Sequence, residues 1–183
     1  YEISGKVLEK EIPGLKSVNA VDSAGVHPLL LAIGSERYTP YNPTKKPQEL
    51  LTIANHILGT GQMSLAKYIF ICDEENSPNI NNEKEYFTHF FERVDWERDL
   101  HFQTKTTIDT LDYSGDGLNE GSKVVIAAAG EIKRTLSEKI DAMNLPQGFL
   151  NLELVSKGNV VIDGKGEINE LILFLEKQNL DGI

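Results

Sequence analysis

Short runs of apolar residues alternate with loop-forming residues through most of the chain. The runs predict five strands, at residues 18–21, 29–33, 67–72, 101–107 and 123–129. Those at 67–72 and 123–129 are apolar at nearly every position, which is typical of strands covered on both faces of a sheet. Residues 101–107 instead alternate between apolar and polar, so we expect that strand to be partly exposed.

Apolar residues also recur at helical spacing between and after these strands. The spacing predicts four helices, whose apolar faces cover residues 50–58, 86–94, 132–143 and 168–175. Pro47 suits the first turn of the first helix and Gly59 its end, whereas Asn82 and Glu85 form the capping pair of the second. The third helix is expected to end before Pro146.

The order of these elements predicts the architecture. Strands that alternate with helices favour a three-layer α/β/α sandwich, with helices on both faces of a mixed sheet. Near the C-terminus, the apolar runs at 149–155 and 160–162 flank the turn sequence Lys157-Gly158-Asn159 and predict a β-hairpin. We therefore expect an α/β domain at residues 1–146, and an appended hairpin and amphipathic helix at residues 147–183.

Charge and cysteine content narrow the class of protein. The 183 residues include 28 acidic and 18 basic side chains, and the net charge of −10 disfavours a nucleic-acid partner. No apolar run approaches the roughly 20 residues that span a bilayer, so we expect no membrane span. The one cysteine, Cys72, excludes an internal disulfide and fits a reducing compartment such as the cytoplasm. Because the sequence opens at Tyr1 without a signal-like segment, we expect a piece of a longer protein.

Residues 109–122 carry three glycines and three aspartates, a composition typical of a functional loop. The run from Asp112 to Gly117 places oxygen ligands as an EF-hand calcium loop begins, but position 12 is Lys123, whose ammonium group would repel the ion. The glycines could also bind a phosphate, yet they precede a strand, whereas a nucleotide-binding glycine loop follows one. A turn-forming loop is the favoured interpretation.

Asp73, Glu74 and Glu75 directly follow a predicted strand, at the edge of an α/β sheet where ligands usually bind. Three carboxylates can hold a divalent cation, but a solvated acidic loop also explains them, and we favour the loop. The histidines are scattered without a zinc spacing, and Cys72 is expected to be a structural thiol. Spacing alone therefore predicts no complete active site.

Four segments of the chain together resemble a known family. They are residues 21–28 (VDSAGVHP), 67–73 (KYIFICD), 91–99 (FERVDWERD) and 107–113 (TIDTLDY). In order and separation they resemble the carboxy-terminal domain of the UbiD-type decarboxylases, the 3-polyprenyl-4-hydroxybenzoate carboxy-lyases. The resemblance runs from about Ser17 to Gly130, and residues 142–183 match none of the better-known members.

The resemblance implies a chemistry for the full-length protein. Family members use prenylated FMN, with a divalent metal (Mn or Mg) and K⁺ at its phosphate, to remove or add CO2 on aromatic or α,β-unsaturated acids. Polyprenyl-4-hydroxybenzoate, in quinone biosynthesis, is one family substrate. The family's catalytic Arg and Glu residues and its metal ligands belong to regions expected to lie outside this chain. We therefore expect no catalytic or metal-binding residue here, and neither activity nor bound cofactor for the isolated chain.

The same resemblance implies candidate site residues. Residues 107–111 reach the substrate pocket, with Ile108 and Thr110 facing the substrate and Asp109 turned away by strand alternation. Simple strand packing is the alternative for both. A family lysine at the cofactor phosphate falls at Lys45 or Lys46, where a flexible ammonium group on a loop before a helix suits an anion. A solvated loop is the alternative for these lysines.

The expected role is that of a lid and oligomerisation domain, which packs over the protein's own N-terminal cofactor domain and closes the pocket for a small carboxylic acid. The alternative is a non-catalytic subunit-interaction module in a homo-oligomer. It is favoured by the aromatic stripe at 86–91 and the apolar helix at 171–175, which offer more apolar surface than one helix face buries. An acidic nucleotide-binding domain is a third alternative, which the misplaced glycines disfavour.

Overall fold

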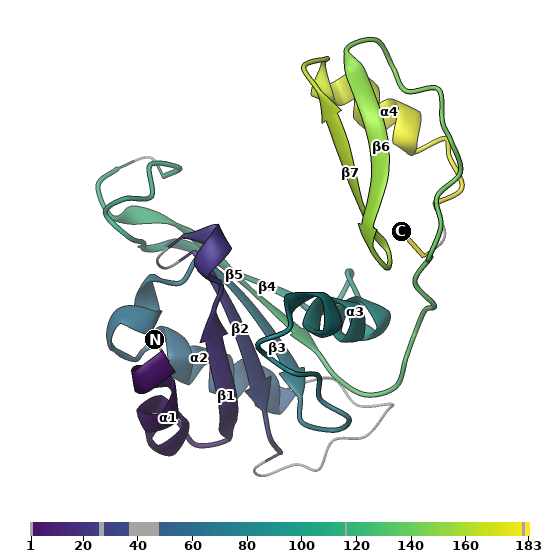
Figure 1. Ribbon diagram of the computed structural model, residues 1–183. Coiled ribbons are helices and arrows are strands. Elements are labelled where there is room, and N and C mark those ends of the chain that lie inside the picture. The colour runs from purple at the N-terminus through teal and green to yellow at the C-terminus, as the bar shows by residue number, and fades with distance from the viewer. Residues whose placement is uncertain (1, 26–27, 37–47, 116, 181) are drawn as a thin grey trace. The chain divides into compact units, whose positions relative to one another are not determined.

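The computed structural model describes residues 2–25, 28–36, 48–115, 117–180 and 182–183, with side chains from residue 6 onward (Figure 1). The chain forms two compact units, residues 1–133 and 134–183. This grouping does not test whether residues 147–183 fold as a separate domain, so that division stays a prediction. Within the described ranges, every helix is too short or too polar to cross a membrane.

The first unit is built on a five-stranded sheet. Its strands are β1 (Leu15–Ala20), β2 (Leu29–Gly34), β3 (Tyr68–Asp73), β4 (Leu100–Thr107) and β5 (Glu120–Ala128). They lie in the order β1-β2-β3-β5-β4. Strands β2, β3 and β5 run parallel, whereas the edge strands β1 and β4 pair antiparallel with their neighbours. The predicted mixed sheet is confirmed, and each predicted strand is present with shifted ends.

Helices cover both faces of this sheet, as expected. The helices are α1 (Glu2–Glu11), α2 (Gln48–Leu58) and α3 (Glu83–Arg93), with short 3-10 helices at Asp22–Ala24 and Gly61–Leu65. Alternate strand residues, such as Leu30 and Ala32, pack with α2 and α1, while Leu31 and Ile33 pack with α3 on the other face. Figure 1 shows α1 and α2 on the face opposite to α3. Helix α1 was not predicted from the sequence.

Helix α3 buries most of the predicted aromatic stripe. The Asn82 side chain accepts a hydrogen bond from the Glu85 N–H (3.3 Å), which confirms the predicted cap. Tyr86 and Phe90 are fully buried, and the Tyr86 hydroxyl lies 2.7 Å from the Phe70 carbonyl oxygen. Burial raises the pKa of the Cys72 thiol to about 12, so this cysteine is a core residue and is not activated as a nucleophile.

The second unit contains the predicted hairpin, β6 (Phe149–Ser156) and β7 (Asn159–Gly164), and the predicted last helix, α4 (Ile168–Leu175). The helix predicted at residues 132–143 was wrong, because no helix is present between residues 131 and 147. The Ser137 N–H donates to the Gly182 carbonyl (2.8 Å), and the Ser137 carbonyl accepts from the Gly158 N–H (2.9 Å). These long-range partners replace the bonds to the preceding turn that a helix requires.

Candidate functional site

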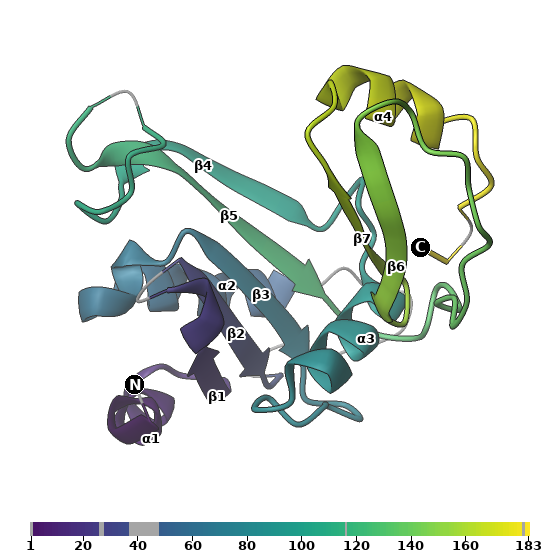
Figure 2. The same ribbon diagram turned by 45° about the horizontal axis from the view of Figure 1, so that its top comes forward.

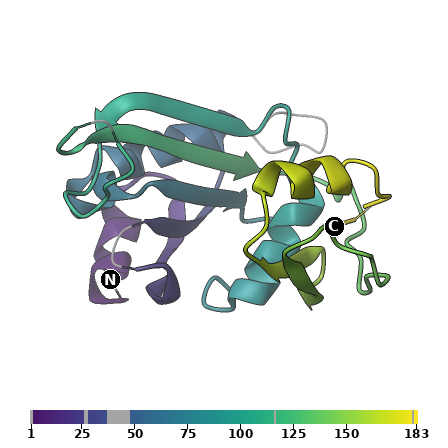
Figure 3. The same ribbon diagram turned by 90° about the horizontal axis from the view of Figure 1, so that it is seen from above.

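An irregular connection, the β4–β5 loop at residues 108–119, links two strands of the sheet in the first unit. It joins two neighbouring antiparallel strands that a short hairpin turn would connect. Figures 2 and 3 show this loop extending past the end of the sheet, at the end of the unit away from α3. Binding residues often lie on loops at the end of a sheet, because the sheet provides a rigid scaffold.

Ile108 and Asn119 fasten the base of the loop. The Ile108 N–H donates to the Asn119 carbonyl oxygen (3.1 Å), and the Ile108 side chain is 1% exposed. A Cβ added at Gly121 would lie 2.7 Å from Ile108 Cδ1, so the absence of a side chain at Gly121 makes room for the isoleucine. Ile108 therefore packs against its own sheet, and its predicted contact with substrate stays a prediction.

A charged contact holds the middle of the loop. Lys67, which directly precedes β3, places its Nζ atom 2.6 Å from Asp112 Oδ2 and also donates to Ser114 Oγ. Asp112 Oδ1 accepts from the Ser114 N–H (2.9 Å). The Lys67 ammonium group and the Ser114 donors lower the pKa of Asp112 to about 2. The carboxylate therefore stays ionised across the physiological pH range.

These contacts argue against the calcium interpretation of the loop. Asp112, which would be the first calcium ligand, already faces an ammonium group. Lys123, at position 12, is buried and donates from Nζ to the Ser64 carbonyl oxygen. Among the described residues, no three His, Cys, Asp or Glu side chains lie close enough together to hold a metal ion.

Gly115 allows the loop to fold back on itself. A Cβ added at Gly115 would lie 1.8 Å from the Glu120 carbonyl oxygen and 2.9 Å from the carbonyl carbon. At Gly117 an added Cβ would meet nothing closer than 3.7 Å. The backbone approach at Gly115 agrees with the turn-forming interpretation of the glycines, since a side chain there would collide with the main chain.

The loop exposes three large apolar side chains that sequence reasoning missed. Leu111 is 71% exposed, Tyr113 is 87% exposed and Leu118 is 84% exposed. Thr110 is exposed beside them, with Oγ1 3.5 Å from Asp109 Oδ1. A signal was available, since apolar residues in a loop rich in Gly and Asp have no place in a strand or helix pattern.

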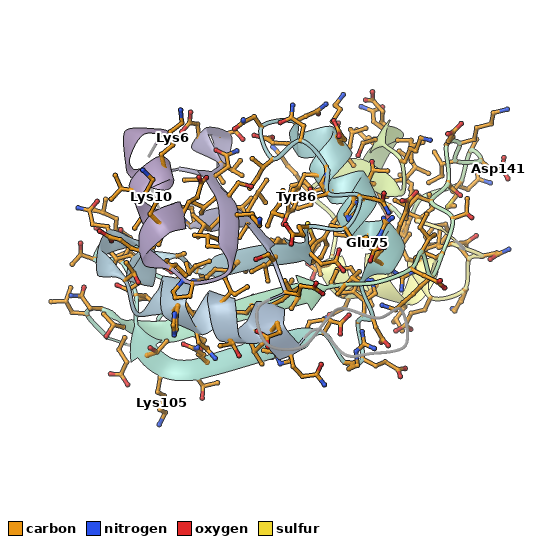
Figure 4. The ribbon with its side chains drawn as sticks, turned by 90° about the horizontal axis from the view of Figure 1, so that it is seen from below. Lys6, Lys10, Glu75, Tyr86, Lys105 and Asp141 are labelled. Atoms are coloured by element: carbon orange, nitrogen blue, oxygen red, sulfur yellow. The ribbon has the colours of Figure 1, made fainter. Side chains whose placement is uncertain are left out.

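A cavity of about 310 Å³ lies under the loop. Its lining residues are Lys67, Lys105, Ser114, Gly115, Glu120, Gly121 and Ser122. Lys105 has a left-handed backbone (φ 51°) within an irregularity of β4 between Gln103 and Thr106. Such bulges redirect a side chain, and Figure 4 shows Lys105 pointing away from its strand.

A second polar region lies at the carboxyl end of β3. Asp73 is buried, and its Oδ2 accepts from the Gly130 N–H (2.8 Å), while Oδ1 has no hydrogen-bond partner among the described residues. Burial raises the pKa of Asp73. Glu74 forms an exposed ion pair with Lys16 (3.2 Å). Among the residues that the structure describes, these three carboxylates do not form a group that could hold a metal ion, and the acidic loop stays the favoured interpretation.

His89 and Arg93 of α3 also face the core. The Arg93 guanidinium donates to the His89 carbonyl oxygen (2.9 Å), and Arg93 lines a cavity of about 400 Å³ with Glu75, Asn76 and Gly130. In Figure 4, Glu75 and Lys105 lie at different ends of the unit, so this cavity is separate from the one under the β4–β5 loop. Burial, and then the charge of Arg93, lowers the pKa of His89 to about 4.

We expect His89 to make the first unit acid-sensitive. The folded protein holds a neutral imidazole down to about pH 4, whereas the unfolded chain takes up a proton near pH 6.5. The contribution of His89 is therefore complete above pH 6.5 and is lost as the pH falls toward 4, by about 3 kcal/mol in the free energy of unfolding. Urea unfolding of the wild type and of His89→Gln at several pH values measures it. An equal loss in both proteins would contradict this assignment, because the other titrating groups are common to both.

The candidate cofactor lysines, Lys45 and Lys46, lie outside the described residues. Their role therefore stays a prediction.

Comparison with known proteins identifies the family. The sequence profile of the 3-octaprenyl-4-hydroxybenzoate carboxy-lyase C-terminal domain matches residues 1–128. The chain belongs to this UbiD family. The match covers all four segments on which the resemblance rested, and it includes the whole β4–β5 loop and the whole five-stranded sheet.

A related sequence carries a decarboxylase name. A protein of Chlamydia pneumoniae, named as one subunit of a 4-hydroxybenzoate decarboxylase, is 34% identical over 125 residues, which are 68% of this chain and 20% of that protein. Across the curated relatives that the chain matches, it spans 20% to 29% of their length. The UbiD domain described here is thus less than a third as long as these relatives.

Solved structures share the fold. Sedimentibacter hydroxybenzoicus vanillic acid decarboxylase in its closed form matches 95% of this chain and 31% of its own, with a TM-score of 0.56 and 18% identity. The UbiD-class enzyme HmfF from Pelotomaculum thermopropionicum, in complex with FMN, matches 77% of this chain and 28% of its own, with a TM-score of 0.53 and 16% identity. The expected architecture, including the terminal hairpin and helix, is confirmed.

Proposed function

We propose that this UbiD domain is the lid of a decarboxylase that uses prenylated FMN to remove CO2 from an aromatic or α,β-unsaturated acid. The observation that carries the proposal is the β4–β5 loop. Leu111, Tyr113 and Leu118 are largely exposed on a loop that the Lys67 contact and the Ile108 anchor hold in place. Several large apolar side chains exposed on one fixed loop are typical of a contact surface.

A lid of this kind acts by excluding water and by fixing one wall of the pocket. When bound, the flavin supplies the electron sink for loss of CO2. The loop would cover the substrate, with Leu111 and Thr110 at its tip, and Ile108 would support the tip from below. A dry, fixed pocket strengthens the electrostatic interactions inside it and holds the acid in a reactive orientation.

The names of the relatives support the substrate class. The curated relative is named for 4-hydroxybenzoate and the solved structure for vanillic acid, both aromatic acids. We propose an aromatic acid as the first substrate class to test, with polyprenyl-4-hydroxybenzoate, and hence a role in quinone biosynthesis, as one member of it.

The described residues do not themselves fit the flavin phosphate or its metal. They contain no metal-binding cluster of three side chains, and the cavity under the loop mixes two lysines with Glu120. We therefore propose that Lys45 or Lys46 meets the cofactor phosphate, and that a divalent metal (Mn or Mg) and K⁺ are held by the remainder of the full-length protein. No reaction step is assigned to this domain.

Activity of the full-length protein tests the proposal. Produced together with a flavin prenyltransferase, it should show flavin absorbance and release CO2 from at least one of a panel of aromatic and α,β-unsaturated acids. The isolated 183-residue chain should release none. A flavin-loaded full-length protein that releases no CO2 from any acid, or an active isolated chain, would contradict the proposal.

Thr110 should influence substrate choice. It is exposed at the tip of the loop, so Thr110→Phe adds a ring on the proposed substrate side without disturbing the core. We expect kcat/KM to fall at least about tenfold for the bulkiest accepted acid, with unchanged flavin content, because an oversized side chain in a pocket is strongly rejected. The exposed Thr104→Phe in β4 is the control. Equal selectivity of the two variants would contradict the predicted position of Thr110 in the substrate pocket.

We propose subunit assembly as a second function, favoured by α4. This helix buries none of its residues within the described structure and exposes Ile168, Ile172 and Leu173. An apolar helix left uncovered usually marks a contact with another protein surface. Light scattering of the full-length protein should give a concentration-independent dimer or larger species, which Ile172→Asp weakens and the exposed Asn169→Asp does not. A monomeric wild type would contradict this function.

A further inference from the structure

We infer that Lys67 is a positioning residue, whose ammonium group fixes the β4–β5 loop so that its apolar tip faces outward. The inference deepens the proposed function and rests on it. The sequence marks Lys67 only as the first residue of a predicted buried strand, and its loop partner Asp112 follows 45 positions later. The pairing is visible only in three dimensions.

Lys67 starts from a rigid base. Its N–H donates to the Pro28 carbonyl oxygen (3.2 Å), and its own carbonyl accepts from the Val124 N–H (2.9 Å). The backbone of Lys67 is therefore bonded both to the segment before β2 and to β5. Because the backbone of Lys67 is fixed, only the rotamers of its side chain remain free. The ammonium group can therefore hold the loop in a defined position relative to the sheet.

The partners of Lys67 lie at the tip of the loop. Asp112 Oδ2 is 2.6 Å from Lys67 Nζ, and Ser114 Oγ accepts from the same nitrogen. The side chains of Lys67 and Asp112 are each only 20% exposed, so this pair is less screened than an ordinary surface ion pair. Charge-assisted hydrogen bonds of this kind are stronger than neutral ones.

The exposed apolar residues are the chain neighbours of Asp112. Leu111 precedes it and Tyr113 follows it, and both are largely exposed. The Asp112 N–H donates to the Asp109 carbonyl oxygen (3.0 Å), which closes a turn around Thr110 and Leu111. An ammonium group that holds Asp112 therefore sets the direction of the side chains on either side. Without it, the turn would remain, but this side-chain link between the loop and the start of β3 would be lost.

Lys105 provides a matched control. It lines the same cavity as Lys67 but makes no ion pair with any of the residues that the structure describes, and its side chain points away from the strand (Figure 4). If Lys67 contributed only positive charge near the loop, its removal should have the same effect as removal of Lys105. If Lys67 holds the loop, its removal should have a larger effect.

Hydrogen exchange and steady-state kinetics of the flavin-loaded full-length protein test the inference. In Lys67→Met, amide exchange across residues 108–119 should rise about tenfold, since a charge-assisted hydrogen bond contributes enough for a tenfold change in an opening equilibrium. The value of kcat/KM should fall while flavin absorbance stays unchanged. Lys67→Arg should restore protection in part, and Lys105→Met should match the wild type in both measurements.

The outcomes separate the inference from the proposed function. Unchanged exchange in Lys67→Met, or an equal increase in Lys105→Met, overturns the inference whatever the activity. Increased exchange with unchanged kcat/KM also overturns it, because the loop would then be held without positioning anything. If the wild type releases no CO2, the proposed function fails, and the exchange comparison still decides whether Lys67 holds the loop.

Discussion

Gly115→Ala is expected to lower kcat/KM for CO2 release by the full-length protein about 100-fold, with flavin content unchanged. The alanine Cβ would lie 1.8 Å from the Glu120 carbonyl oxygen, and neither backbone segment can accept that distance. The loop must shift, and with it the side chains at its tip. Displacement of a positioned group by about 1 Å is enough for a loss of this size. Steady-state CO2 release with the best acid of the panel measures it.

Gly117→Ala is the matched control for this prediction. Gly117 lies two positions further along the same loop, and its nearest potential contact, Glu120 Oε2, is 3.7 Å away on a flexible side chain. We expect kcat/KM within about twofold of the wild type, since an ordinary van der Waals contact does not move the backbone. Equal activity of the two alanine variants would show that the shape of the loop does not matter for turnover.

Asp99→Ala should strongly destabilise the first unit, by about 3 kcal/mol in the free energy of unfolding. Asp99 is completely buried, and its carboxylate accepts from Arg98 Nε (2.5 Å), Arg98 Nη2 (2.9 Å) and the Asp95 N–H (2.9 Å). Lys133 Nζ lies 3.9 Å away. Removing the carboxylate leaves the Asp95 N–H and the Arg98 guanidinium, both in part-buried hydrogen bonds, without this acceptor.

Urea unfolding followed by Trp96 fluorescence measures this loss, because the chain has one tryptophan and it lies in the first unit. Glu74→Ala is the control. It removes a carboxylate from an exposed ion pair with Lys16, where we expect a change below about 0.5 kcal/mol. A similar small effect for Asp99→Ala would show that the buried carboxylate contributes no more than a surface charge.

The strands were predictable because a strand that is buried on both faces has apolar residues at nearly every position. Strands β3 and β5, covered by helices on both faces, read as continuous apolar runs, and the cap of α3 at Asn82 follows from local chemistry. The apolar residues at 132–143 have helical spacing, but backbone groups of this segment bond to distant parts of the chain. Gly158 and Gly182, which bond to Ser137, are far along the chain, and no local pattern contains them.

The candidate site was predictable only in part, because strand alternation ends where β4 ends. Ile108 and Thr110 lie beyond Thr107, the last residue of β4, and a turn begins at Asp109. Ile108 is buried and Thr110 is exposed, so the two residues do not share one environment. Their contact with substrate stays a prediction for both.

The role of Asp112 shows a second reason why the candidate site was predictable only in part. Its spacing from Ser114 and Gly117 resembled the start of a calcium loop, and the residue that explains it, Lys67, lies just before β3, far away in the sequence. Charge pairing across the fold decides what a loop carboxylate does, and spacing within the loop cannot show it. Leu111 and Tyr113 beside it stand out in the sequence as apolar residues of a polar loop, but only the fold shows that both are largely exposed.

The proposed lid role can be seen in a crystal structure of the full-length protein with flavin and a bound aromatic acid. We expect Thr110 or Leu111 within about 4 Å of the bound acid, with the β4–β5 loop closed over the flavin. A structure in which the acid is enclosed entirely by other parts of the protein, while this loop faces solvent, would contradict it.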